Sequence, residues 1–254
     1  MSSLDDQLKG YVRERLSSIC HGENLASKNR GAYTYYKTIK ELNIRLQKAS
    51  ENIRVGMIGE LMVHIIIGII WKDYRTIVPY FNLEDRNIKK GLDSIIYSIS
   101  NGMWAAEVKS GVEDKNDLES LNLKTKNLLD VAHNDISGKL KSNDETQRIW
   151  QHAMNGFQVA CSHLKDEKQG IENIIFRNQE LNEDKECSPS NFNVILSSVA
   201  LCVTENDISL ENIEEIFKKR CSSYDQMMII SIRKSIEEEL KEFLVTEEKN
   251  NERT

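Results

Sequence analysis

Residues 52–71 constrain the fold most, because they are apolar almost all the way round a helix. A helix of that kind has to be enclosed by other elements, so it belongs at the centre of a domain. Its longest apolar run, residues 61–71, is well short of the ~20 residues that cross a bilayer. We therefore expect no membrane contact, and an N-terminus without basic and apolar signal regions leads us to expect a cytoplasmic protein.

The rest of the chain combines helical and strand patterns. Only two prolines occur in 254 residues, which favours helices as the main element. Apolar residues at helical spacing predict helices over residues 4–19, 33–49, 118–140, 145–164, 210–221 and 224–244. Residues rich in β-branched and aromatic side chains predict strands over residues 93–100, 103–109 and 191–204. The fold class is therefore α/β or α+β.

The pattern divides the chain into three regions. We expect an N-terminal helical region over residues 1–50, a core over residues 51–205 and a C-terminal helical region over residues 206–254. Inside the core, residues 165–190 are polar and acid-rich, which predicts a long connection with short structure at most. The charged tail, residues 247–254, lacks apolar anchors and is expected to fray.

The net charge argues against a protein that coats nucleic acid by charge alone. The chain has 34 Lys and Arg against 40 Asp and Glu, a formal charge of -6. The charge is uneven, since residues 1–50 carry nine basic and five acidic side chains, whereas residues 205–254 carry eight and thirteen. We expect weak intrinsic affinity for DNA and dependence on a complex.

A predicted hairpin brings three ionisable groups together. The dipeptide at residues 101–102, Asn-Gly, predicts a type I′ turn between two strands. Pairing the strands across that turn puts Asp93 opposite residue 110, close to Glu107 and Lys109. Because Glu107 and Lys109 are two apart on a strand, their side chains point to one face. The three groups converge at the end of the hairpin away from the turn.

Converging carboxylates indicate a divalent metal, because burying them without a compensating cation is expensive. Mg²⁺, or Mn²⁺ in its place, takes oxygen ligands that Asp93, Glu107 and the Val108 carbonyl could supply. Lys109 could orient or deprotonate an attacking water and stabilise charge on a phosphoryl oxygen. Glu60 lies in the apolar segment 52–71, where an unpaired carboxylate is costly, and is a further candidate ligand.

These residues resemble the PD-(D/E)xK nuclease superfamily. The carriers of the resemblance are Gly-Leu-Asp at residues 91–93, Glu-Val-Lys at residues 107–109 and a preceding helix with Glu60. Leu92 stands where the motif has its proline. The resemblance implies an α/β fold whose restriction-endonuclease-like core is a small mixed sheet flanked by helices, with extra helices at both ends. It also implies that Asp93 and Glu107 bind metal, Lys109 assists the water and Glu60 completes the site.

Within that superfamily, residues 52–140 are most similar to the HamA family, and the similarity extends weakly to residues 191–204. The strings that carry it are residues 58–66, 90–96 and 106–109. The resemblance implies a Mg²⁺-dependent DNA endonuclease, the effector of bacterial Hachiman antiphage defence. It further implies a heteromeric complex with a helicase, HamB, which holds the nuclease inactive until aberrant DNA is present.

A second interpretation remains open, a non-catalytic regulatory or scaffold subunit that kept the fold. Such a subunit would bind a partner protein through its acidic C-terminal helices. His64, four residues after Glu60, fits a core histidine better than a metal ligand. Four lysines are candidate DNA contacts and equally candidate solvated side chains; they are Lys89, Lys90, Lys124 and Lys126.

Overall fold

The fold is organised around one mixed β-sheet. The computed structural model describes residues 6–81, 92–113, 117–141, 144–161, 167–202, 206–234 and 237–251. In those residues the strands are β1 (Arg75–Thr76), β2 (Ser94–Ser98), β3 (Gly102–Glu113), β4 (Asn193–Cys202) and β5 (Gln226–Lys234), in that order across the sheet. The pairs up to β3 are antiparallel, and the pairs from β3 to β5 are parallel. This confirms the expected α/β class with a small mixed sheet.

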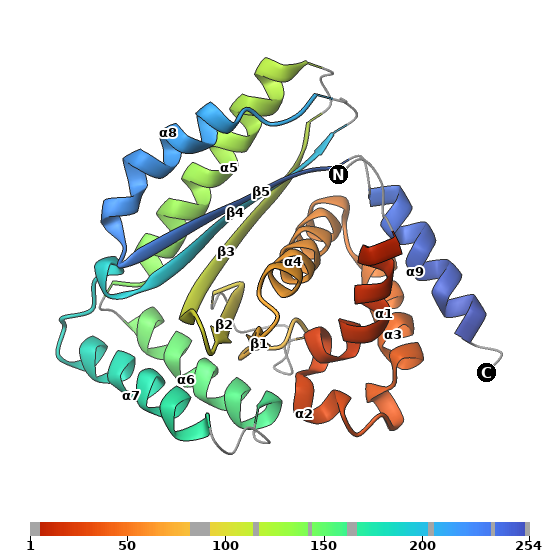
Figure 1. Ribbon diagram of the computed structural model, residues 1–254, viewed down its shortest axis with the longest axis horizontal. Helices are drawn as coiled ribbons and strands as arrows, with labels where there is room; N and C mark the ends of the chain where they lie inside the picture. Colours follow the sequence, from red (N-terminus) through yellow and green to blue (C-terminus); the bar gives the residue numbers. More distant parts are fainter. Residues whose placement is uncertain are drawn as a thin grey trace.

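Helices cover both faces of the sheet (Figure 1). They are α1 (Asp6–His21), α2 (Glu23–Ala26), α3 (Tyr35–Lys48), α4 (Glu51–Ile70), α5 (Leu118–Lys139), α6 (Asp144–Ala160), α7 (Lys168–Glu183), α8 (Leu210–Arg220) and α9 (Glu237–Asn251), with 3₁₀ turns η1 (Gly31–Tyr33), η2 (Pro189–Asn191) and η3 (Cys221–Ser223). α4 packs on one face of β3, and α5 packs on the other face beside α8. α1, α3 and α9 form a further layer outside α4, while α6 and α7 pack together.

The apolar helix α4 is enclosed as its sequence predicts. One side of α4 contributes Val63 and Ile67 to a core that it shares with β3, and another side contributes Leu61 and Ile65 to a core with α1, α3 and α9. By length and composition α4 could cross a membrane, with 20 residues and a mean hydropathy of 2.0 over its most apolar window. However, 56% of that window is buried inside the fold, as in the core helix of a soluble protein.

The predicted turn and register of the β2–β3 hairpin are wrong. The loop is three residues long, 99–101, and Ser98 pairs with Gly102, which has a φ of 75°. Such a loop is typical of a type I turn followed by one left-handed residue. The carboxylate of Asp73 stabilises this loop, because it accepts hydrogen bonds from the Ser100 backbone N–H and the Ser98 hydroxyl, both at 2.8 Å. The register moves by three positions, so that Asp93 comes beside Glu107 rather than residue 110.

Three other predictions are also wrong. Residues 224–244 are not one helix, because β5 occupies the first half and α9 begins at Glu237. β5 packs on both of its faces, since Met227 and Ile229 contact one core and Ile232 contacts another. The polar stretch 165–190 contains α7, which buries Ile171 and Ile175. The expected fraying of the tail fails as far as Asn251, because Glu247 of α9 accepts hydrogen bonds from Arg13 and Tyr35; residues 252–254 lie outside the described residues.

A close approach of α4 to β3 depends on one glycine. A Cβ atom at Gly59 would lie 1.7 Å from Ser110 Oγ and 2.9 Å from Ser110 Cβ. At Gly56, three residues earlier on the same helix, an added Cβ has no heavy atom within 4 Å. Alanine at either position changes the helix propensity of α4, but only alanine at residue 59 disturbs its packing on β3. Comparing the two substitutions therefore separates the two effects.

Gly59→Ala should lower the free energy of unfolding by about 1–3 kcal/mol, because the added methyl group forces α4 and β3 apart. Gly56→Ala should raise it by up to about 1 kcal/mol, since alanine favours a helix. Urea unfolding of both variants measures the difference. Equal effects of the two substitutions would contradict the close packing of α4 on β3.

Candidate active site

The candidate site lies where β2 separates from β3. The two strands pair only as far as Ser94 and Ala106, while β3 continues to Glu113 with β4 on its other edge. Asp93 stands at this point, and its Oδ2 accepts a hydrogen bond of 2.7 Å from the Val108 backbone N–H. The carboxylate thus takes the place of the missing strand. Because the N–H and C=O of one strand residue point to the same edge, the Val108 carbonyl faces the side on which Asp93 lies.

A chain of alternating charges connects β3 to α5. Glu107 has no exposed surface, and its two oxygens accept hydrogen bonds from Lys139 Nζ at 2.8 and 2.7 Å. Lys109 Nζ donates to Glu107 Oε1 at 2.7 Å and lies 2.7 Å from Asp135 Oδ2. Glu107 and Lys109 come from one face of β3, and Asp135 and Lys139 come from successive turns of α5. We call Lys139, Glu107, Lys109 and Asp135 the charge chain.

Glu60 reaches the site from α4, on the opposite face of the sheet. With Asp93, Ser94 and His64 it lines a small cavity of about 10 Å³. Burial, then the charges of Asp93 and Glu107, raise the pKa of Glu60 to about 8. Burial and the charge of Glu107 raise the pKa of Asp93 to about 6. Two carboxyl groups are therefore held together with too little positive charge to keep both ionised easily.

The charge chain fixes the protonation state of Lys109. Burial lowers its pKa, but Glu107 and Asp135 outweigh that effect and leave the pKa well above its ordinary value. Lys109 is therefore a cation at neutral pH. Of the two roles expected for it, this state suits orienting a water and stabilising negative charge, and it does not suit removing a proton.

The structure brings the four predicted residues to one place, although from both faces of the sheet. Sequence reasoning missed Lys139 and Asp135. A signal for Lys139 exists, because it continues the buried stripe of α5, where a lysine needs a carboxylate partner. The other members of that stripe include Leu121, Thr125, Leu129, Ala132 and Ile136.

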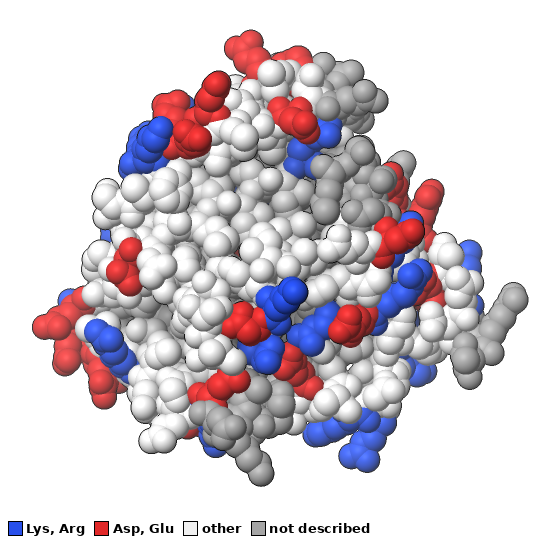
Figure 2. Space-filling model, in the orientation of Figure 1, with Lys and Arg blue, Asp and Glu red and all other residues white. Residues whose placement is uncertain are grey.

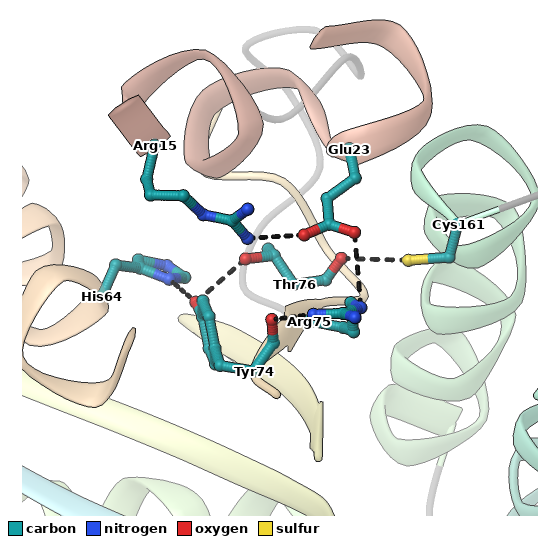
Figure 3. A network of polar contacts seen from close by, with 7 residues as sticks. All are labelled: Arg15, Glu23, His64, Tyr74, Arg75, Thr76 and Cys161. Atoms are coloured by element: carbon teal, nitrogen blue, oxygen red, sulfur yellow. Dashed lines mark hydrogen bonds and ion pairs between the residues drawn. The ribbon is translucent and has the colours of Figure 1, made fainter. Parts of the chain in front are cut away.

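His64 is a core histidine, as its position predicts. Its ring Nδ1 shares a hydrogen bond with the Tyr74 hydroxyl, and burial lowers its pKa to about 4. Figure 3 shows this pair beside a group of ion pairs in which Glu23 contacts both Arg15 and Arg75. The contacts tie α4, α1 and α2 to β1, and so help to fix the edge of the sheet behind the cavity.

The lysines predicted as DNA contacts are only partly placed. Lys89 and Lys90 lie outside the described residues. Lys124 of α5 lies against Gly111 of β3, where an added Cβ would be 2.7 Å from its Cε. Lys126 is exposed on the same helix. Their role in binding stays a prediction.

The donor atoms at the site fit a hard divalent cation. Glu60, Asp93, Glu107 and the Val108 carbonyl offer only oxygen, which is what Mg²⁺ and Mn²⁺ prefer. Burial and the charges of neighbouring carboxylates raise the pKa of Glu60 and of Asp93, and a bound divalent cation would lower both. Among the described residues no three acidic, His or Cys side chains already form a metal-binding group, since Lys139 and Lys109 hold the oxygens of Glu107.

The family model described as HamA matches residues 3–248 of the 254-residue chain. The matched region includes the whole sheet and the helices from α1 to most of α9. No curated protein matches the chain.

Glu60→Gln should stabilise the protein at pH 8.5 but not at pH 5. The ordinary pKa of 4.5 and the folded value of about 8 mean that the folded state binds more protons between them. Wild-type stability therefore falls as the pH rises from about 4.5 to about 8, and glutamine removes that loss, which is up to about 5 kcal/mol for a shift of this size. Urea unfolding at several pH values measures it.

Glu14→Gln is the matched control, because Glu14 is exposed on α1. That variant should keep the wild-type dependence of stability on pH. A Glu60→Gln profile parallel to wild type would show that Glu60 ionises normally in the fold.

Proposed function

The chain belongs to the HamA family, and on that premise we propose that it is the nuclease effector of a Hachiman-type antiphage defence system. It would be a Mg²⁺-dependent DNA endonuclease controlled by a helicase partner. The observation that carries the proposal is the position of Asp93 at the free edge of β3, hydrogen-bonded to Val108 between Glu107 and Lys109. A strand edge with that set of side chains supports phosphodiester hydrolysis.

Each residue of the site has a role in this proposal. Asp93, Glu107 and the Val108 carbonyl would hold Mg²⁺ or Mn²⁺, with Glu60 as a further ligand. When bound, the metal supplies a Lewis acid and a more acidic water. Lys109, held as a cation by its neighbours, would orient the attacking water and stabilise negative charge on the phosphoryl oxygens.

Lys139 is a positioning residue for Glu107. Its ammonium group is mostly buried, and it contacts both oxygens of a carboxylate that has no access to solvent. That contact fixes the rotamer of Glu107 at the point along β3 where Asp93 lies. Because Lys139 comes from the last turn of α5, the site depends on how α5 packs on the sheet.

Dependence on a partner is supported by the distribution of charge. Figure 2 shows a face on which Lys and Arg are scattered among Asp and Glu around a broad uncharged area. The basic surplus of the N-terminal region is partly neutralised by ion pairs within the chain, because Arg13 pairs with Glu247 and Arg15 pairs with Glu23. A surface of this kind binds the DNA backbone weakly, so a helicase partner that delivers DNA fits the molecule.

A non-catalytic scaffold is the second candidate. Glu107 is completely buried and contacts two lysines. A purely structural ion pair has the same arrangement, which favours this candidate. The expected partner surface on the acidic C-terminal helices is reduced, since Glu247 contacts Arg13 and Glu248 accepts a hydrogen bond from Asn43. Metal binding and cleavage separate the two candidates.

Glu107→Gln and Lys109→Ala should each reduce Mg²⁺-dependent DNA cleavage by about 100-fold or more, because they remove a metal ligand and a charge-stabilising group. The assay uses the full chain with its helicase partner and a labelled DNA duplex. Glu119→Gln, at an exposed position in the first turn of α5, is the control and should cleave like wild type. Undiminished cleavage by the first two variants would exclude the proposed site, and wild type that neither cleaves DNA nor binds Mn²⁺ would favour the scaffold.

Lys139→Met should lower the free energy of unfolding by about 3–5 kcal/mol, because it leaves the Glu107 carboxylate buried with one fewer cation. Adding Glu107→Gln to that variant should recover a large part of the loss, since the double variant no longer buries an uncompensated charge. Guanidinium unfolding of both single variants and the double variant completes the cycle. Losses that simply add would show that the two residues do not interact.

A further inference from the structure

A pocket of about 470 Å³ lies beside the beginning of β3 and β4, between these strands and α7. Its walls come from β3, α6, α7, the segment 190–193 and the residue before β5. The pocket uses none of Glu60, Asp93, Glu107 or Lys109, and its volume is that of a small-molecule site. We call it the Trp150 pocket.

The inner wall offers an unsatisfied donor and an unsatisfied acceptor. Trp150 is 1% exposed and stacks on Phe192 with ring centroids 5.4 Å apart, yet its Nε1 has no hydrogen-bond partner among the described residues. Asn193 Nδ2 donates to the Met103 carbonyl at 3.2 Å, which leaves the buried Oδ1 without a partner there. Each such atom costs about 1–3 kcal/mol. A ligand with an acceptor beside a donor would satisfy both.

The rim offers complementary charged groups. Arg177 is exposed on α7 and forms no ion pair with any residue that the structure describes. The neighbouring Asn178 is 8% exposed, and its amide has no hydrogen bond within the described part of the chain. Asp225 also lines the pocket, held in place by its backbone N–H bond to the Phe192 carbonyl at 3.1 Å. A guanidinium suits a phosphate, and a carboxylate accepts hydrogen bonds from sugar hydroxyls.

We propose that the Trp150 pocket binds a nucleoside monophosphate. The edge of a nucleobase carries an acceptor beside a donor, which matches Trp150 Nε1–H and Asn193 Oδ1. The phosphate would contact Arg177, and a sugar hydroxyl would contact Asp225. The proposal goes beyond phosphodiester hydrolysis and stands on different residues, so either can fail without the other.

The pocket lies near the candidate active site, so the nucleotide that it binds could come from either of two sources. Ala105 lines the pocket, and Glu107 is two residues further along the same face of β3, a step of roughly 6.6 Å along the strand. The occupant is therefore either a free nucleotide or a nucleotide at the end of a DNA strand near the candidate active site.

Calorimetric titration of the full chain with ribo- and deoxyribonucleoside monophosphates tests the proposal. At least one should bind with a Kd of about 10 µM to 1 mM. Arg177→Ala should weaken binding about tenfold, and removing the phosphate from the ligand should weaken wild type but not this variant. Arg148→Ala, at an exposed position of α6 outside the pocket, should bind like wild type.

The variant Trp150→Phe removes the inner donor and should lower the preference for one base, with thermal unfolding as the check on its fold. Asn193→Ala, which removes the inner acceptor, should lower the same preference and serves in its place if that variant does not fold. Competition by a short single-stranded oligonucleotide assigns the ligand to a DNA strand end, and lack of competition assigns it to a free nucleotide. Absence of binding at millimolar nucleotide, or equal effects of Arg177→Ala and Arg148→Ala, would overturn the proposal.

Discussion

The buried carboxylate of Glu107 is the constraint on which the surrounding structure depends. An ionised group without access to water is stable only if cations and hydrogen bonds replace its hydration. Lys139 and Lys109 supply them, and Lys109 is held in turn by Asp135. Since two members of this charge chain belong to α5, the helix can neither slide nor rotate on β3 without exposing Glu107 or leaving it unpaired. The electrostatic requirement of one side chain thus fixes the packing of a layer.

The second constraint is the place where β2 leaves β3. Beyond Ala106 no strand in the described part of the chain pairs with this edge of β3, and the Asp93 carboxylate accepts the hydrogen bond that a strand would otherwise accept. The same gap lets Glu60 of α4 approach from the other face of the sheet. Groups from opposite faces meet because the sheet is interrupted, and burial together with repulsion between carboxylates raises the pKa of Glu60 and of Asp93. Buried carboxylates this close together are stable only when a cation binds between them or when one of them is protonated.

The elements that sequence predicts well are those whose pattern is local. The all-round apolar α4 and the same-face pair Glu107 and Lys109 follow from periods of 3.6 and 2. The hairpin register does not, because Asp73, about 25 residues before the turn, selects the loop through its hydrogen bonds to Ser98 and Ser100. Similarly, β5 is a strand because it pairs in parallel with β4. No local period in residues 226–234 predicts that pairing.

The candidate site also contains residues that the local sequence identifies and residues that only the fold identifies. Asp93, Glu107, Lys109 and Glu60 are identified by residue type and spacing, although the convergence of Glu60 from the far face needs the three-dimensional fold. Lys139 is 32 residues from Glu107 along the chain, and only its place in the buried stripe of α5 marks it. A buried lysine in a helix implies an acidic partner but does not say which one.

The net charge of -6 acquires a different meaning once the ion pairs are placed. Basic residues that could bind DNA form ion pairs within the chain, as Arg13 and Arg15 do, and Lys109 and Lys139 contact Glu107. What remains on the face in Figure 2 is scattered charge around an uncharged area. Long-range attraction to a polyanion requires gathered positive charge, so this surface supplies little of it. For the proposed nuclease, so little surface for holding DNA is consistent with a substrate that another subunit holds.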